Sequence, residues 1–502
     1  MIPLTLAEIA ATTGGRLHRA DGTAVVTGSV EFDSRQLARG GLFVAMPGER
    51  VDGHDFAAAA VAAGAAGVLA ARAVDAPAVL VPPVSRAHTR SVALTGDTDG
   101  AGAAVLAGLA ALARDVAGRL IRDGLVVVGV TGSSGKTSTK DLIAQLLAPE
   151  GPTVAPPGSF NNELGHPWTV LRADRSTRHL VLELSARGQG HIAELCRVAP
   201  PRIGVVLNVG SAHLGEFGSR AAIAQAKGEL VEALDDGGVA VLNADDPLVA
   251  AMATRTSARV VLAGEDRRAE VRAVDVVLDE HARAAFRLVT PRGEAAVRLG
   301  LHGAHHVGNA LAAAAVAGEL GIGVDEVARR LSLARRVSAR RMDVTTRPDG
   351  VTVVNDAYNA NPESVRAALN SLAAMTAGVD GRHRSWAVLG MMGELGDAHA
   401  AAHQEIGRFA ARLGVGRLVV VGDAAAPLWQ GARSAGMEGE GAVLVPDVDT
   451  AIALLEDELA PGDVVLVKAS KSEALWRVAE GLLAERSSPG SSPGESSRGG
   501  RA

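Results

Sequence analysis

The chain has 502 residues and a formal net charge of -6. At about 100–200 residues per domain, this length predicts about three domains. Hydrophobic residues make up 47% of the chain and charged residues 21%, which excludes wholesale disorder. The mild acidity gives no reason to expect a nucleic-acid partner, because phosphates call for a basic surface. Cys196 is the only cysteine, which excludes an intramolecular disulfide and suits a reducing compartment.

The N-terminal region, residues 1–118, combines short strand-like runs such as Leu42–Met46 with Ala-rich helical patterns and Gly turns. Residues 1–17 lack a positive segment followed by a long apolar core, so we expect no secretory signal and a cytoplasmic location. The Ala-rich stretches Phe56–Ala71 and Ala101–Ala113 fall short of the ~20 residues that span a membrane. We expect soluble helices there, no membrane insertion, and a smaller α/β domain.

A second block, residues 119–336, contains β-branched apolar runs separated by helical patterns. The runs are Leu125–Val130, Leu180–Leu184, Ile203–Leu207 and Val239–Leu242. Such runs are typical of strands buried on both faces, and their alternation with helices predicts an α/β domain with a mainly parallel sheet.

The pattern changes again near Val337, and residues 337–485 contain four more apolar runs separated by helical segments. These runs are Val351–Val354, Trp386–Leu389, Leu418–Val421 and Val464–Val467. They predict a third α/β domain. Residues 486–502 repeat an SSPG unit and offer nothing to bury, so we expect a disordered tail.

A phosphate-binding loop follows the first strand of the second block. Leu125–Val130 runs into TGSSGKT, and a helical pattern continues from Ser138 to about Leu147. Backbone amides of such a loop surround phosphate oxygens, and the helix N-terminus adds favourable partial charge. The residues expected to hold the nucleotide are Gly132, Ser133, Ser134, Gly135, Lys136 and Thr137, with the Thr137 hydroxyl on Mg²⁺. Because Val130 breaks the strict consensus, a Gly-rich turn that merely contains lysine is the alternative, and the loop alone names no reaction.

Three further side chains are candidates for metal chemistry, each with a plainer alternative. Glu183 ends an apolar strand, where a carboxylate is costly unless it is paired or bound to a metal. His213 follows the next strand, although a lone loop histidine is more often surface. Lys227 lies on a predicted helix, where lysine is normally solvated. Only five of the 50 basic residues are lysine, however, and an ammonium does chemistry that a guanidinium cannot.

Several segments resemble the Mur ligase family in order and spacing, over roughly residues 25 to 485. TGSSGKTSTK, SFNNELGHPWTVLR, VLELSARGQGHI and LNVGSAHLGEFGSRAAIAQAKGEL resemble its central ATPase domain, and LHGAHHVGNALAAAAVA a helix of that domain. RRMDV, NDAYNANPESVRAAL, LGMMGELGDAHAAAHQEIG and VLVKASKS resemble the Rossmann-like C-terminal domain of the members that add D-alanyl-D-alanine. DSRQLARGGLFVAMPGERVDGHDF resembles the N-terminal domain that holds a UDP-sugar.

The resemblance implies an ATP-dependent ligase with two Mg²⁺ ions and a role for each matching residue. Lys136 and Thr137 would serve ATP and the first Mg²⁺, which Glu183 would share. His213 would hold the second Mg²⁺, supported by a carbamate formed on Lys227. The remaining implied contacts are Asn309 with adenine, Arg341 with the γ-phosphate, Asp356 near the ribose and phosphates, Ser34 and Arg35 with the uridine nucleotide, and Asn161 and Asn162 with the peptide.

Some positions depart from the family pattern without removing a proposed phosphate or metal ligand. His306 stands where Asn or Gln is frequent, and Asn355 where the first of two aspartates is frequent. Lys471 replaces a common arginine, and Met391 a frequent acidic residue.

The implied reaction joins D-alanyl-D-alanine to UDP-N-acetylmuramoyl-tripeptide through an acyl phosphate, which is a step of peptidoglycan synthesis. We expect the enzyme to be monomeric. Tyr358, Asn359, Asn361 and Lys468 would line the dipeptide pocket, with Lys468 or Lys471 meeting its carboxylate; Tyr358 is equally well explained as a packing ring. One alternative is a relative that adds another amino acid, either a diamino-acid-adding Mur ligase or a folylpolyglutamate synthase. The other is a nucleotide-gated binding protein without activity. An Asp-Asn-Pro-Arg segment typical of the diamino-acid enzymes is absent from the sequence. The DSR segment argues against the folate enzyme.

Overall fold

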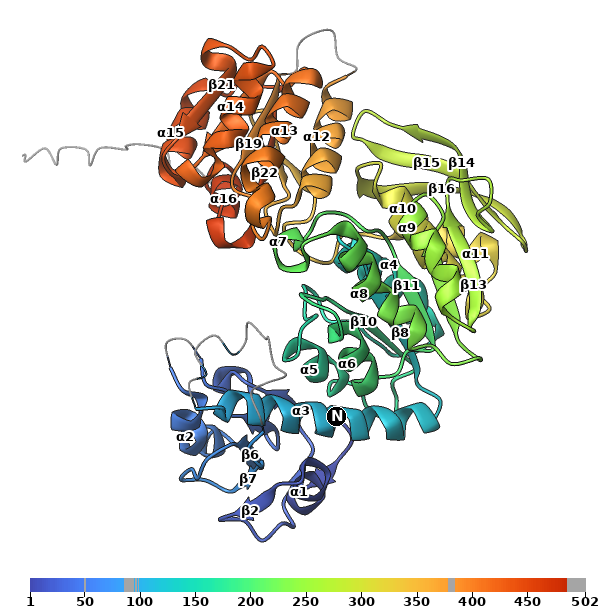
Figure 1. Cartoon of the computed structure of the whole chain (residues 1–502), viewed down its shortest axis with the longest axis vertical. Coiled ribbons are helices and arrows are strands. Elements are labelled where there is room, and N and C mark those ends of the chain that lie inside the picture. The colour runs from blue at the N-terminus through green and yellow to red at the C-terminus, as the bar shows by residue number, and fades with distance from the viewer. Residues whose placement is uncertain (49–50, 85–93, 95–96, 98, 378–383, 485–502) are drawn as a thin grey trace, which may run out of the picture.

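The computed structural model describes residues 1–48, 51–84, 94, 97, 99–377 and 384–484. They form three units that follow one another along the long axis of the molecule, with the central unit between the N-terminal and C-terminal units (Figure 1). Each unit has its own mixed or parallel sheet with helices packed on it. The predicted α/β class with three units is confirmed, whereas the tail predicted to be disordered, residues 486–502, lies outside the described residues.

The N-terminal unit is built on a five-stranded sheet in which β4 to β7 are parallel and β2 is antiparallel to β7. The strands in sheet order are β2 (Arg16–His18), β7 (Ala78–Leu80), β6 (Gly67–Ala70), β5 (Leu42–Val44) and β4 (Val30–Glu31), and β1 (Leu4–Thr5) pairs separately with β3 (Val25–Val26). The helices are α1 (Leu6–Thr13), α2 (Ala57–Ala62) and α3 (Ala101–Arg122).

The helix expected over Phe56–Ala71 is wrong in its second half. α2 ends at Ala62, Gly64 turns the chain with a φ of 113°, and the chain then enters β6, whose four residues are all buried in the sheet. Alanine and glycine carry too little side chain for periodicity to separate a buried strand from a helix. The sequence pattern therefore could not show the change from helix to strand.

The helix α3 connects the N-terminal unit to the central unit. Leu112, Val116 and Leu120 are buried along it, in a core that also contains Val127 and Leu180 of the central sheet. The domain boundary expected after residue 118 falls inside this helix, and it stays a prediction. A buried hydrogen bond from the Trp168 indole to Glu31 (3.1 Å) also joins the two units.

The central unit contains a nine-stranded sheet whose strands, in sheet order, are β16 (Gly293–His302), β15 (Arg283–Thr290), β14 (Val271–Leu278), β13 (Arg259–Gly264), β12 (Val239–Asn243), β11 (Ile203–Val206), β8 (Val126–Thr131), β10 (His179–Glu183) and β9 (Thr153–Val154). Its helices are α4 (Lys136–Leu147), α5 (Gly165–Val170), α6 (His191–Val198), α7 (Leu214–Phe217), α8 (Arg220–Glu232), α9 (Pro247–Ala250), α10 (His306–Glu319) and α11 (Val324–Leu333). Only the β14–β15 and β15–β16 pairs are antiparallel in the described part of this sheet.

The strand β8 lies inside the parallel part of this sheet, between β11 and β10, and is buried on both faces. Val127 packs in the core on one side, whereas Val128 and Val130 pack in the core on the other. The chain adds β10 on one side of β8 and β11 on the other. The order of strands therefore reverses at β8, and ligands of open α/β sheets bind at the carboxyl ends of strands at such a point.

The C-terminal unit is a six-stranded sheet in the order β17 (Asp343–Thr346), β18 (Thr352–Asn355), β22 (Val464–Lys468), β19 (Ser385–Leu389), β20 (Arg417–Val421) and β21 (Ala442–Val445), with β17 antiparallel. The helices are α12 (Pro362–Thr376), α13 (His399–Arg412), α14 (Ala426–Ser434), α15 (Val448–Glu458) and α16 (Trp476–Leu483). Because β18, β22 and β19 are parallel neighbours, their carboxyl ends lie together at one edge. That edge faces the central unit (Figure 1).

Two glycines allow α13 and α14 to approach each other closely. A Cβ on Gly407 would overlap the Leu428 carbonyl oxygen, and one on Gly431 would overlap the Gln404 carbonyl oxygen. Gly407→Ala is therefore expected to lower the free energy of unfolding of the C-terminal unit by about 1–3 kcal/mol, through overpacking against backbone. Urea unfolding followed by circular dichroism measures this change.

The control is Gly318→Ala in α10, where a Cβ would meet nothing within 4 Å. Alanine is a better helix former than glycine by about 1 kcal/mol, so this variant should be as stable as the unmodified chain or more stable. Equal stability of Gly407→Ala and Gly318→Ala would contradict the packing argument.

Candidate active site

The phosphate loop leaves the carboxyl end of β8 and is held from the neighbouring strand β11. Asn208, which follows β11, accepts hydrogen bonds from the backbone amides of Ser133 (3.1 Å, to its carbonyl) and Ser134 (2.9 Å, to its side chain). Gly135 has a φ of 82°, and a Cβ on it would lie 2.6 Å from Asn309 Oδ1. The loop conformation therefore needs glycine at position 135 for both its backbone and its contact with α10.

The Lys136 ammonium points back over this loop and donates a hydrogen bond to the Gly132 carbonyl oxygen at 2.7 Å. Burial lowers the pKa of Lys136, and the nearby Glu183 carboxylate acts in the opposite direction. The side chain still lines a cavity of about 190 Å³. A partly desolvated cation at the N-terminus of α4 is suited to bind phosphate oxygens.

The Glu183 carboxylate, at the carboxyl end of β10, is buried in a network of oxygen and nitrogen donors. Its Oε2 accepts a hydrogen bond from the Thr137 hydroxyl (2.9 Å), and its Oε1 accepts from Ser159 (2.8 Å) and Asn161 (2.8 Å). The Thr137 and Glu183 oxygens are the hard ligands that Mg²⁺ prefers. Their arrangement fits a cation next to the phosphate loop.

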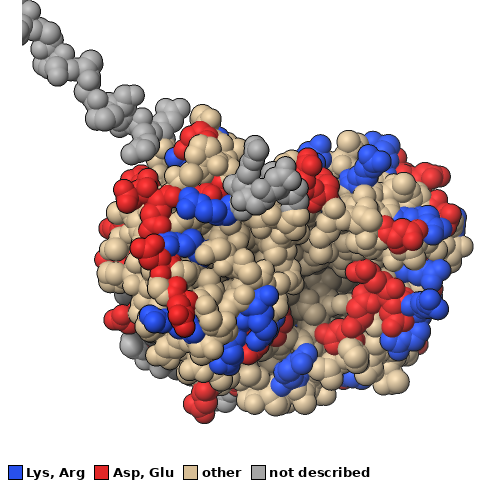
Figure 2. Space-filling model, turned by 90° about the horizontal axis from the view of Figure 1, so that it is seen from above, with Lys and Arg blue, Asp and Glu red and all other residues tan. Residues whose placement is uncertain are grey.

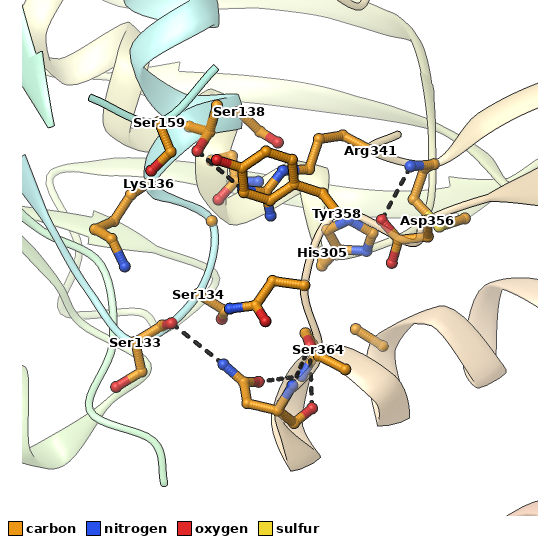
Figure 3. A pocket seen from close by; sticks show the side chains of 18 of the residues that line it. Ser133, Ser134, Lys136, Ser138, Ser159, His305, Arg341, Asp356, Tyr358 and Ser364 are labelled. Atoms are coloured by element: carbon orange, nitrogen blue, oxygen red, sulfur yellow. Dashed lines mark hydrogen bonds between the residues drawn. The ribbon is translucent and has the colours of Figure 1, made fainter. Parts of the chain in front are cut away.

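Side chains of the C-terminal unit form the opposite wall of the cavity. Arg341 donates to the Thr137 hydroxyl at 3.2 Å, and its guanidinium lies 4.0 Å from the Tyr358 ring centroid (Figure 3). The Nε of Arg341 is buried without a hydrogen-bond partner among the described residues. An unsatisfied guanidinium donor in a cavity with Lys136 favours an anionic ligand, since a buried donor without a partner is costly.

Asp356 and Lys468 form a buried ion pair in the same wall. The Lys468 ammonium lies 2.6 Å from Asp356 Oδ2, and it also donates to the carbonyl oxygens of Asp356 (3.3 Å) and Asn359 (2.9 Å). These contacts use all three donors of the ammonium. Burial lowers the pKa of Lys468, whereas Asp356 raises it. Lys468 therefore orders the Asp356–Asn359 turn and has no donor left for a ligand.

Residues of α10 and α12 complete this cavity. Asn309 is buried beside Gly135, with its Nδ2 3.4 Å from His306 Nδ1, so His306 contributes by contacting Asn309. Asn361 caps α12 by accepting from the Ser364 amide (2.8 Å), and its Nδ2 donates to the Ser133 carbonyl (3.3 Å). Asn355 accepts from the Ala357 amide (3.2 Å), which is a local turn contact.

A second cavity of about 380 Å³ adjoins the first, and the two share Ser159, Asn161, Tyr358 and Asn359. Its other lining residues include Asn162, Arg187, His213, Glu394 and Lys471. The Lys471 side chain is exposed and makes no hydrogen bond or ion pair within the described part of the chain. The second cavity therefore presents the Lys471 ammonium to a ligand, whereas the donors of Lys468 are all used.

His213 and Lys227 lie on the central unit near these cavities. His213 precedes α7 with a φ of 61°, and its Nδ1 lies 2.6 Å from Glu394 Oε2. Lys227 lines neither cavity; it is buried in α8, and among the described residues its ammonium has no hydrogen bond or ion pair. Burial, and to a smaller extent the Lys136 charge, holds the pKa of Lys227 well below its usual value.

Ser34 and Arg35 do not join this group. They lie in a short turn of the N-terminal unit, where the Arg35 guanidinium is 87% exposed and pairs with Asp33 at 2.8 Å. Neither residue lines the two cavities. Any role in binding a uridine nucleotide belongs to a surface separate from the phosphate loop.

Several site residues were missed from sequence: Ser159, Arg187, Asn208 and Glu394. The position of Asn208 directly after the Ile203–Leu207 run was a usable signal, since carboxyl ends of adjacent parallel strands converge. Glu394 similarly lies in the turn after β19. Arg187 and Ser159 belong to segments that showed only the family resemblance, and their contacts depend on tertiary structure.

The surface carries both signs of charge, and the face in Figure 2 has a hollow at its centre with acidic side chains along one wall. Among the described helices, none combines the length and the hydropathy needed to cross a bilayer.

Comparisons with known proteins match the chain to three family models. They are described as "Mur ligase family, catalytic domain" (residues 27–96), "Mur ligase middle domain" (130–317) and "Mur ligase, glutamate ligase domain" (340–471). The chain is 56% identical to the UDP-N-acetylmuramoyl-tripeptide--D-alanyl-D-alanine ligase of Mycobacterium tuberculosis, over 97% of this chain and 98% of the relative.

Two solved structures are similar over nearly the whole chain. MurF from Acinetobacter baumannii superposes with a TM-score of 0.81 at 29% identity, covering 96% of this chain and 99% of the other. MurF ligase from Thermotoga maritima in complex with ADP superposes with a TM-score of 0.74 at 29% identity, covering 91% and 97%.

The position of Lys136 generates a direct prediction. Lys136→Ala should reduce phosphate release from ATP by about 100-fold or more, because it removes a preorganised charge from the phosphate loop. Circular dichroism should show an unchanged fold, since the side chain lines a cavity and does not fill a core. A folded variant that releases phosphate at a near-normal rate would rule out the phosphate-loop assignment.

Proposed function

The chain belongs to the Mur ligase family, and we propose that it joins D-alanyl-D-alanine to UDP-N-acetylmuramoyl-tripeptide with cleavage of ATP to ADP and phosphate, giving the UDP-linked pentapeptide used in peptidoglycan synthesis. The identity of 56% over 97% of the chain to a ligase of that name carries this proposal. The cavity between the Lys136 loop and the Asp356–Asn361 turn supports it. All of these residues come from one chain, so we propose that a monomer suffices. We also propose a cytoplasmic location, which suits a single cysteine.

The reaction requires activation of a carboxylate, because an amine that attacks the carboxylate carbon cannot expel an oxide ion as leaving group. A carboxylate oxygen of the tripeptide attacks the γ-phosphorus of ATP, and the bond between the γ-phosphorus and the bridging oxygen breaks to give an acyl phosphate and ADP. The dipeptide amine then attacks the acyl carbon, loses a proton, and expels phosphate. Lys136 and Arg341 flank the cavity as cations that offset the charge of the transferring phosphoryl group.

We propose that Thr137 and Glu183 hold one Mg²⁺ and that His213 with a carbamate on Lys227 holds a second. Mg²⁺ supplies charge neutralisation to the phosphates. The hydroxyl and carboxylate oxygens of the first pair, 2.9 Å apart, are suitable donors for this ion. Asn309 would contact the adenine and Asp356 the ribose and phosphate side, as the family resemblance implies.

The surroundings of Lys227 support the carbamate. Burial and the Lys136 ammonium both favour the neutral amine, which is the form that attacks CO₂ to give a carbamate and a proton. The carbamate would be an anion beside the Lys136 cation. Carbamylation therefore places a negative charge near the Lys136 ammonium, where the neutral amine carries none.

The second cavity is the proposed site for the dipeptide and the end of the tripeptide. Asn161 and Asn162 line it from the central unit, and Tyr358 and Asn359 line it from the C-terminal unit. Since the Lys468 ammonium is fully occupied, we propose that Lys471 meets the dipeptide carboxylate and that Lys468 and Asn361 support the wall. The UDP group would bind on the N-terminal unit near Ser34 and Arg35.

The Lys227 assignment can be tested with two substitutions. Lys227→Ala is expected to lose activity by orders of magnitude and to recover part of it with added short-chain carboxylates, which replace the carbamate. Lys227→Arg should be equally poor, because guanidinium stays protonated and forms no carbamate. Carbon-13 NMR after addition of labelled bicarbonate should show a carbamate signal in the unmodified chain alone. An active arginine variant would show that only positive charge is needed.

The choice of amine is tested by competition between two substrate pairs. We expect turnover of UDP-N-acetylmuramoyl-tripeptide with D-alanyl-D-alanine, measured as phosphate release. The corresponding dipeptide with meso-diaminopimelate or lysine should not turn over, because the distal ammonium would be left buried without a partner, a penalty of about 1–3 kcal/mol or more. Turnover of the second pair alone would identify a diamino-acid-adding enzyme, and turnover of neither pair, with ATP still bound, would favour a binding protein.

A further inference from the structure

The turn after β19 brings Glu394 of the C-terminal unit into contact with the central unit. Glu394 Oε2 lies 2.6 Å from His213 Nδ1, and Oε1 accepts a hydrogen bond from Arg187 Nη2 at 3.0 Å. Both partners belong to the central unit. The two carboxylate oxygens are therefore used to connect the units, and His213 is the only imidazole among these contacts.

The backbone at this point is held equally closely. The Gly215 amide, at the start of α7, donates to the Glu394 carbonyl oxygen at 3.1 Å. A Cβ on Gly215 would lie 2.6 Å from the Gly396 nitrogen, so the two glycines allow the close approach. Glu394 itself has a φ of 62°, a left-handed conformation that is strained for a side-chain-bearing residue. Such strain persists only where surrounding contacts determine the conformation.

The contact with Nδ1 determines how His213 can serve as a ligand. The 2.6 Å pair is a charge contact that lacks the alignment of a hydrogen bond, but an unprotonated Nδ1 this close would set its lone pair against a carboxylate oxygen, so His213 Nδ1 carries the proton. In the neutral ring the lone pair is then on Nε2, and the ring cannot rotate without losing the contact. Partners of this kind fix the tautomer and orientation of metal-binding histidines and strengthen them as ligands.

We propose that Glu394 is a positioning residue that prepares His213 Nε2 to bind the second Mg²⁺ only when the C-terminal unit is docked on the central unit. The inference rests on the proposed function, since it takes His213 as a metal ligand. In this role Glu394 would act through His213 and not as a ligand itself, although its carboxylate lies within 4.8 Å of ligand atoms of both His213 and Glu216. Arg187 holds the second carboxylate oxygen and keeps Oε2 directed at the imidazole.

Two substitutions separate the effect of the negative charge of Glu394 from the effect of its contact with His213. Glu394→Gln keeps the size and an acceptor oxygen but removes the charge, and Glu394→Ala removes the contact altogether. The control is Glu440→Gln, an equal change of charge on an exposed residue of the same unit that pairs with Arg417 (3.2 Å). The control variant should behave like the unmodified chain.

The measurement is binding of Mn²⁺ by electron paramagnetic resonance, with a non-hydrolysable ATP analogue and the UDP-tripeptide present. The weaker of two Mn²⁺ sites should lose about 10-fold in affinity in Glu394→Gln and about 100-fold in Glu394→Ala, the range known for partners of metal ligands. Affinity for the ATP analogue, measured by calorimetry without added metal, should change less than twofold. In steady state kcat should fall, recover partly at raised Mg²⁺, and leave KM for ATP unchanged.

The inference is overturned if both variants bind two Mn²⁺ ions as tightly as the Glu440→Gln control. It is equally overturned if affinity for the ATP analogue falls as much as affinity for Mn²⁺, because Glu394 would then only hold the units together. The Mn²⁺ comparison does not use the amine. A failed D-alanyl-D-alanine assay would therefore refute the proposed substrate and leave this result to be judged separately.

Discussion

Buried positive charge at the junction of the central and C-terminal units is the constraint on which the rest of the site depends. Lys227 and Lys468 are almost completely buried, and Lys136 is partly desolvated beside them. Removing an ammonium from water costs several kcal/mol unless an anion is close. Asp356 provides that anion for Lys468 and Glu183 partly provides it for Lys136, whereas Lys227 has none among the described residues. Lys227 is therefore held as the neutral amine, and the positive charge left for a polyphosphate is that of Lys136 and Arg341.

The two sheets explain how these charges come together. The carboxyl ends of β8, β10 and β11 carry the phosphate loop, Glu183 and Asn208, and those of β18 and β22 carry Asp356 and Lys468. The loops that follow these strands can differ in sequence, while the strands fix where each loop begins. Because the two edges face each other, one cavity receives side chains from both units, and neither unit alone contains the site.

The sequence predicted eight of the parallel strands of the central and C-terminal units, each a continuous apolar run typical of burial on both faces, but it did not predict β9, β13 and β21, which are also parallel. The position of Glu183 at a strand end made it a candidate metal ligand, and the family resemblance implied that it shares one site with Lys136. Periodicity failed for Gly67–Ala70, because a four-residue apolar run at the end of an Ala-rich stretch is too short to tell a strand from a helix. Contacts between distant parts of the chain, such as Glu394 with His213 and Lys468 with Asp356, have no local pattern that encodes them. For this reason Lys468 was expected to meet substrate, although its donors are already used.

The capping of α12 has a thermodynamic consequence. Asn361 caps this helix and also contacts the Ser133 carbonyl, so the N-termini of α12 and α4 open on the same cavity although they belong to different units. Each helix N-terminus carries about half a positive charge. The two add at the phosphate position only while the units are docked. By linkage, if docking raises the affinity for polyphosphate by some factor, bound polyphosphate raises the equilibrium constant of docking by the same factor. The nucleotide then acts as the effector of the domain arrangement that its own chemistry requires.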